Sequence, residues 1–88
     1  MLEFRLEGAV SPTILRVASF RFYFFSREER RLHVHVQSPD GEAKYWIDPQ
    51  IQLAENVGLS PATLRRIERL VKEHEGEIRK AWRDHFGG

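Results

Sequence analysis

Two histidines, His33 and His35, are the residues of this chain whose type and spacing most directly suggest chemistry. They alternate with Val34 and Val36, in a stretch rich in aromatic and β-branched residues that favours β-strands. Side chains two positions apart project from the same face of a strand, so the two imidazoles should lie side by side. If the valines point into the core, the imidazoles occupy the open face.

The histidine pair would hold a metal ion if a carboxylate or a third imidazole joined it. The available donors are Glu42, Asp48, His74 and His85. The chain has no cysteine, so a zinc site would use nitrogen and oxygen ligands alone, and no established zinc spacing is present. We therefore expect neither a metal nor another cofactor, and structural histidines are the simpler interpretation.

The same pair would also serve as general acid and base in RNA cleavage, with Lys44, Tyr45 and nearby arginines beside the phosphate. Nothing in the spacing of His33 and His35 requires this chemistry. We therefore favour a protein that is not an enzyme and assign no catalytic residue.

Alternating apolar and polar residues predict an antiparallel sheet of three to five strands within about residues 2–47. The turn-forming segment Ser38-Pro39-Asp40-Gly41 separates two of these strands. Residues 1–11 form an N-terminal extension whose charged, alternating start suits an edge strand. Residues 12–88 are expected to form a single α+β domain.

Two start signals predict helices after the sheet. Asp48-Pro49 favours a short helix at about residues 49–57, ended by Gly58 in a left-handed conformation. Ser60-Pro61 begins a long helix at about residues 61–86, whose apolar residues recur at steps of three and four. This long helix is expected to cover one face of the sheet.

Several spaced motifs from Pro12 onward resemble a family of small bacterial proteins, domain of unknown function 4160. The motifs are Pro12-Thr13-Ile14-Leu15-Arg16, the aromatic run 20–25, His33-Val34-His35-Val36, the run from Ala43 to Pro49, and a final helix ending near Trp82 and Phe86. One departure is Arg31-Leu32, which stands where the family has two prolines. The resemblance implies the fold and a recurrent histidine pair. It also implies a toxin–antitoxin-like pairing with a second small protein, but no mechanism.

The segment 51–72 follows the helix-turn-helix template, with Ala54 and Gly58 at the spacing of a tight corner. In that interpretation four basic side chains would reach DNA. They are Arg65, Arg66, Arg69 and Lys72. A helix-turn-helix core needs a further helix upstream, where this chain has a strand instead, so DNA binding is an alternative rather than the first choice.

Large aromatic residues occur on both faces of the predicted strands, and one long helix covers only one face. The residues expected at a partner contact are Tyr23, Phe25, Tyr45 and Trp46. An exposed aromatic patch on a small domain usually marks a protein contact. We therefore predict a protein-interaction module that binds a partner or a second copy of itself.

Composition narrows the kinds of partner and the cellular location that we expect. Fourteen basic and thirteen acidic residues among 88 give a net charge of +1, so no overall field attracts nucleic acid or a membrane. The start of the chain does not resemble a signal peptide, and no apolar run is long enough to span a bilayer. We expect a cytoplasmic protein with no membrane partner.

Overall fold

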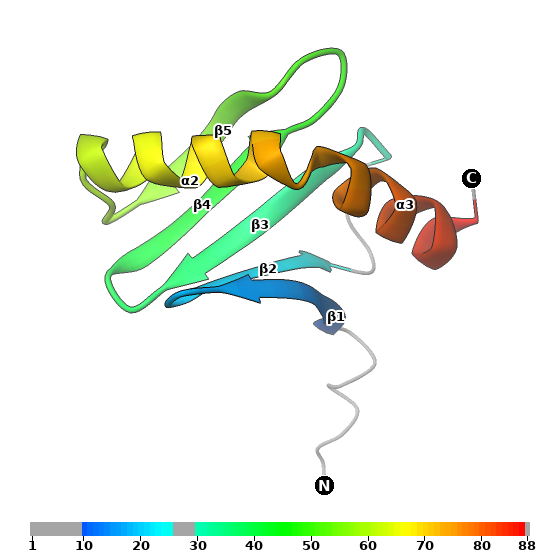
Figure 1. Cartoon of the computed structure of the whole chain (residues 1–88), viewed down its shortest axis with the longest axis horizontal. Coiled ribbons are helices and arrows are strands. Elements are labelled where there is room, and N and C mark those ends of the chain that lie inside the picture. Colours follow the sequence, from blue (N-terminus) through cyan, green and yellow to red (C-terminus); the bar gives the residue numbers. More distant parts are fainter. Residues whose placement is uncertain (1–9, 26–29, 88) are drawn as a thin grey trace, which may run out of the picture.

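The computed structural model describes residues 10–25 and 30–87. Five antiparallel strands come first, each paired with the next in sequence, and two helices follow (Figure 1). The strands are β1 (Val10–Val17), β2 (Phe20–Phe25), β3 (His33–Ser38), β4 (Gly41–Trp46) and β5 (Gln52–Val57), and the helices are α2 (Pro61–Glu73) and α3 (Glu75–Phe86). The predicted α+β class, with a helical layer after the sheet, is confirmed.

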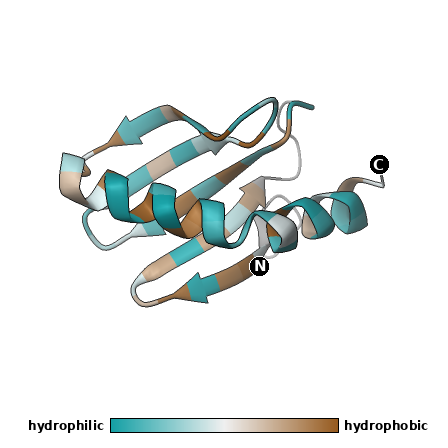
Figure 2. Cartoon of the chain, turned by 45° about the horizontal axis from the view of Figure 1, so that its top comes forward, coloured by the Kyte–Doolittle hydropathy of each residue, from teal (hydrophilic) through white to brown (hydrophobic). Residues whose placement is uncertain are grey.

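The helices cover one face of the sheet, and the core lies between the two layers (Figure 1). On the sheet side, the register places Phe22 beside Val36 and Val36 beside Ala43. On the helix side, Ile67 and Ile78 are fully buried. Each such side chain stabilises the fold by about 2 kcal/mol when it leaves water. Hydrophilic residues follow the outer side of the helices (Figure 2), as an amphipathic layer requires.

The expected single helix at 61–86 is two helices that meet at His74. Ser60 caps α2, because its hydroxyl oxygen accepts a hydrogen bond from the Thr63 backbone N–H at 3.1 Å. The backbone leaves the helical conformation at His74, with φ −107° and ψ 18°. Glu75 and Glu77 then lie in the first turn of α3, where acidic side chains favour the positive end of a helix dipole. These acids explain why a new helix starts there.

The prediction of a short helix at about 49–57 is wrong, because residues 52–57 form β5. Leu53 pairs with Tyr45 of β4, and Val57 pairs with Glu42. Without this pairing the outer backbone groups of β4 would lack partners, and this requirement outweighs the weak local start signal at Asp48-Pro49. The edge strand expected near the start of the 1–11 extension lies outside the described residues.

Glycine is required where the β3–β4 turn meets the end of β5. A Cβ on Gly41 would lie 1.9 Å from the carbonyl oxygen of Val57. Gly58 has φ +82°, and a Cβ there would lie 2.8 Å from the carbonyl oxygen of Asp40. The left-handed conformation expected at Gly58 is therefore present, but it ends a strand instead of a helix.

Candidate interaction site

Four rings contact one another in a row across β2, β3 and β4. They belong to Tyr23, His33, His35 and Trp46, and with Lys44 we call them the ring cluster. Tyr23 pairs with His35 across β2 and β3, and the rings stack with centroids 5.3 Å apart. The His33 ring meets that of His35 at 5.1 Å and that of its cross-strand partner Trp46 at 5.8 Å. Neighbouring strands thus assemble the cluster through their register.

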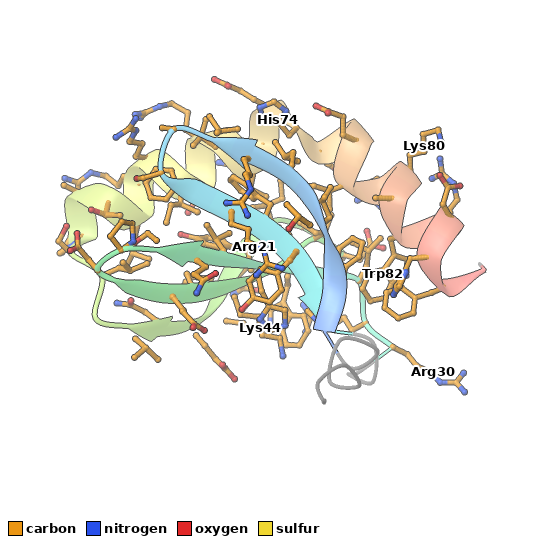
Figure 3. All side chains as sticks on the ribbon, turned by 90° about the horizontal axis from the view of Figure 1, so that it is seen from below. Arg21, Arg30, Lys44, His74, Lys80 and Trp82 are labelled. Carbon is orange, nitrogen blue, oxygen red and sulfur yellow. The ribbon has the colours of Figure 1, made fainter. Side chains whose placement is uncertain are left out.

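Cations lie over the rings of this cluster. The Arg31 guanidinium carbon lies 4.1 Å from the centre of the Trp46 ring, and the Lys44 ammonium lies 4.6 Å from it. Arg21 lies over Tyr23 at 4.5 Å. Figure 3 shows Arg21 and Lys44 over the sheet, away from His74 and Lys80 on the helices. Each cation–ring contact is worth about 0.5 to 2 kcal/mol, depending on how far it is shielded from water.

Val34 and Val36 lie in the core, but the two histidines are buried as well instead of being open to solvent. His33 is 0% exposed and His35 is 8% exposed. The Nδ1–H of His33 donates to the carbonyl oxygen of Arg31 at 2.6 Å, and its ring also contacts Trp82 of α3, with centroids 5.3 Å apart. His33 therefore joins the end of the sheet to the end of the helical layer, which is a structural role.

Burial also changes the expected partner surface. Tyr45 is on the covered face, 1% exposed, and its hydroxyl donates to the carbonyl oxygen of Leu64 at 3.0 Å. Burial, followed by the nearby Glu68 carboxylate, raises the pKa of Tyr45 to about 12. Tyr23 is 4% exposed, and only Trp46 of the described aromatic candidates is partly exposed. The side chain of Phe25 lies outside the described residues.

The donors considered for a metal do not gather around the histidine pair. Within residues 10–25 and 30–87, no group of three His, Asp or Glu side chains is placed to hold a metal ion. A carboxylate oxygen of Asp48 accepts from Arg79 at 2.8 Å, and His74 contacts Glu77 at 2.5 Å. Asp48 and His74 therefore contact side chains of α3 instead of the histidine pair.

The helix-turn-helix interpretation is wrong, because its first helix is β5. The four basic residues assigned to DNA are nevertheless exposed on α2. Lys72 pairs with Glu68 at 3.2 Å, and the Arg66 guanidinium lies over the Phe20 ring at 5.3 Å. Arg65 and Arg69 line a shallow surface groove with Glu68 and Lys72. The helix-turn-helix motif, which was the reason for assigning these residues to DNA binding, is absent.

An exposed strand edge at β5 was missed by the sequence analysis. In the described part of the chain, β5 is the last strand of the sheet and has only β4 beside it. Leu53 is 40% exposed and Val57 is 68% exposed. We call the outward side of Gln52–Val57 the β5 edge. Only Val57 in this segment is β-branched, so the sequence carried little strand signal there.

The two outer strands differ in how they resist pairing with another chain. β1 has two register shifts and carries Pro12 and Arg16, features that protect sheet edges. β5 has one register shift and no proline, lysine or arginine. An edge with exposed apolar residues and few protections is suited to receiving a strand.

A small cavity of about 30 Å³ connects the ring cluster to the β5 edge. It is lined by His35, Glu42, Ala43, Lys44, Glu55 and Val57. Glu55 pairs with Lys44 in the register, and Glu42 pairs with Val57. Side chains of a bound strand would therefore meet both acidic and apolar groups beside the cluster.

The fold and this site define a small α+β protein with a helical layer over one face of an antiparallel sheet. Residues 19–83 match the model of a family described as Domain of unknown function (DUF4160). The chain belongs to this family, as the resemblance indicated. No curated protein and no solved structure matches the chain. Function is therefore argued from the contacts above.

Neither helix among the described residues is both long enough and apolar enough to cross a membrane.

Proposed function

We propose that this protein is a protein-interaction module that binds an extended segment of a partner along the β5 edge, next to Trp46. The observation that carries the proposal is the exposure of Leu53 and Val57 on an outer strand with few edge protections. Strand addition to such an edge combines backbone hydrogen bonds with pockets for alternate side chains.

The ring cluster supports this proposal as a rigid platform. Trp46 pairs with Gln52 at one end of β5 and lies under the Arg31 guanidinium. A partner strand on β5 would extend the sheet beside this partly exposed ring, and aromatic and arginine side chains dominate the energetics of many interfaces. The proposal therefore moves the contact surface from the aromatic face predicted from the sequence to the neighbouring edge.

A cytoplasmic setting and a toxin–antitoxin-like pairing with a second small protein belong to the same proposal. The family resemblance supports the pairing, and the charge balance of +1 gives no reason to prefer nucleic acid as the partner. No catalytic step is proposed for His33 and His35, because His33 is fully buried between two tryptophans.

The test uses tagged full-length protein as bait in cells of its source organism. Replacing Leu53 and Val57 together by Lys places two charges on the β5 edge, and we expect it to abolish recovery of the wild-type partner. The control is Ala62→Lys, which adds a charge at an exposed position of α2, outside β5. Thermal melts of all three proteins check folding. Partner recovery unchanged by the double variant would refute the proposal.

A further inference from the structure

The side chains at the β5 edge that face away from the helices have a specific charge. Lys44 pairs with Glu55 and Glu42 pairs with Val57, so Glu42 and Glu55 are diagonal neighbours on this face. Such neighbours lie about 7 Å apart, within reach of one long side chain placed between them. Both carboxylates are exposed, and both line the small cavity next to Val57.

The charge available to a partner at this edge is negative. β5 itself contains one acid, Glu55, and no base. The nearest base, Lys44, is 5% exposed, and its ammonium lies over the Trp46 ring at 4.6 Å. A strand that docks here therefore meets two exposed carboxylates and the apolar side chain of Val57.

A second copy of this chain fits the edge poorly. If β5 paired antiparallel with its own copy about a two-fold axis at Glu55, the two Glu55 residues would stand directly opposite each other. Directly opposite side chains project from the same face of the sheet, so the two Glu55 carboxylates would be neighbours, and neither strand carries a base. Like charges across strands destabilise pairing.

We infer that the strand received at the β5 edge belongs to a different protein and carries a lysine or arginine that meets Glu55 and Glu42, with an apolar residue two positions away that contacts Val57. The inference rests on the proposed function and names the chemistry of its partner. Backbone hydrogen bonds supply the attachment, and the two carboxylates select the sequence.

The test is a selection from a displayed library of peptides of about eight residues, the length of an ordinary strand. All positions of the peptides are random, so a basic residue and an apolar residue can occur two positions apart on one face of the strand. Wild-type protein is expected to enrich peptides with Lys or Arg at one random position. The Glu55→Lys variant is expected to enrich Asp or Glu there. For one selected basic peptide, this variant should weaken binding about tenfold in fluorescence anisotropy, and the acid-swapped peptide should restore it.

Amide chemical shifts locate the bound peptide. The inference predicts that shifts concentrate in residues 52–57 and spare β1. A library that returns no binder at β5 overturns the inference, and so does concentration-dependent dimerisation of the protein alone through β5. Peptides that bind at β5 without charge preference also overturn it but leave the proposed function standing. The proposed function fails separately if the Leu53 and Val57 double variant still recovers the partner.

Discussion

His33 is held from three directions at the end of the sheet. Its Nδ1 donates to the Arg31 carbonyl oxygen, and its ring lies against Trp46 of β4 and Trp82 of α3. A fully buried polar ring that is hydrogen-bonded in this way contributes both packing and a satisfied donor. It fixes the end of the sheet against the last helix.

We predict that His33→Ala lowers the free energy of unfolding by about 2 to 4 kcal/mol, because it leaves a cavity and an unsatisfied carbonyl group. Urea denaturation followed by tryptophan fluorescence measures this change. The control is His85→Ala, an exposed position where we expect a change within about 0.5 kcal/mol. Equal effects of the two substitutions would contradict a structural role for His33.

Tyr45 gives the fold a pH dependence in the alkaline range. Its pKa is raised by burial and by Glu68, from 10.0 to about 12. The folded protein favours the protonated phenol of Tyr45. The stability that this preference contributes is complete below pH 10 and is lost as pH rises toward the folded pKa.

Between about pH 9 and about pH 11.5 we expect the wild type to lose about 1 to 2 kcal/mol more stability than Tyr45→Phe does. At neutral pH the same substitution should cost about 1 kcal/mol, because the hydrogen bond to the Leu64 carbonyl oxygen is removed. Urea titrations of both proteins across this range measure the difference. If the free energy of unfolding changed with pH equally in both proteins, folding would not raise the pKa of the Tyr45 phenol.

For single residues, strand alternation was sufficient to place His33 and His35 side by side, and their ring centroids lie 5.1 Å apart. It did not reveal their burial or the contact of His33 with Trp82. That contact joins residues far apart in sequence, and it depends on where α3 crosses the end of the sheet. A local pattern holds no information about such a crossing.

Among the elements, β5 depends on the turn between β3 and β4. Gly41 lies so close to the backbone of Val57 that no side chain fits between them. The end of β5 and the start of the helical layer are joined by Asn56, whose side-chain amide donates to and accepts from the backbone of Leu59. Changes at the turn should therefore displace β5.

We predict that Gly41→Ala destabilises the protein by about 2 kcal/mol or more, because its Cβ would overlap the Val57 carbonyl oxygen. The matched control is Gly76→Ala in α3, where nothing lies within 4 Å of an added Cβ. There we expect stabilisation of up to about 1 kcal/mol, because Ala favours helix more than Gly does. Thermal melts measure both, and equal effects would contradict the close packing at Gly41.

The sequence predicted the strand–turn–strand pattern and the amphipathic helical region because both depend on local periodicity and turn chemistry. It failed at residues 49–57, where the Asp48-Pro49 signal and the Ala54–Gly58 spacing favoured a helix. The segment is a strand because β4 requires a hydrogen-bonding partner. It likewise did not show that the helix ends at Glu73 and begins again at Glu75.

In the whole molecule, the two faces of the sheet make different contacts. The helical layer buries Phe22, Val36 and Ile67 on one face, while the Tyr23 and His35 rings stack on the other. In our proposal, the β5 edge is the place where a partner strand is added without disturbing the core. The sequence analysis placed a partner contact on the aromatic face, and it did not reveal the burial of Tyr23 and Tyr45, which depends on the assembled layers.

The most direct test of the account is amide hydrogen exchange of the full-length protein, alone and with the partner recovered by the wild-type bait. We predict that exchange in residues 52–57 slows at least about tenfold on binding, because the outward amides of β5 gain hydrogen bonds, while exchange in β1 is unchanged. Protection confined to the exposed face of α2, with β5 exchanging as fast as in the free protein, would contradict it.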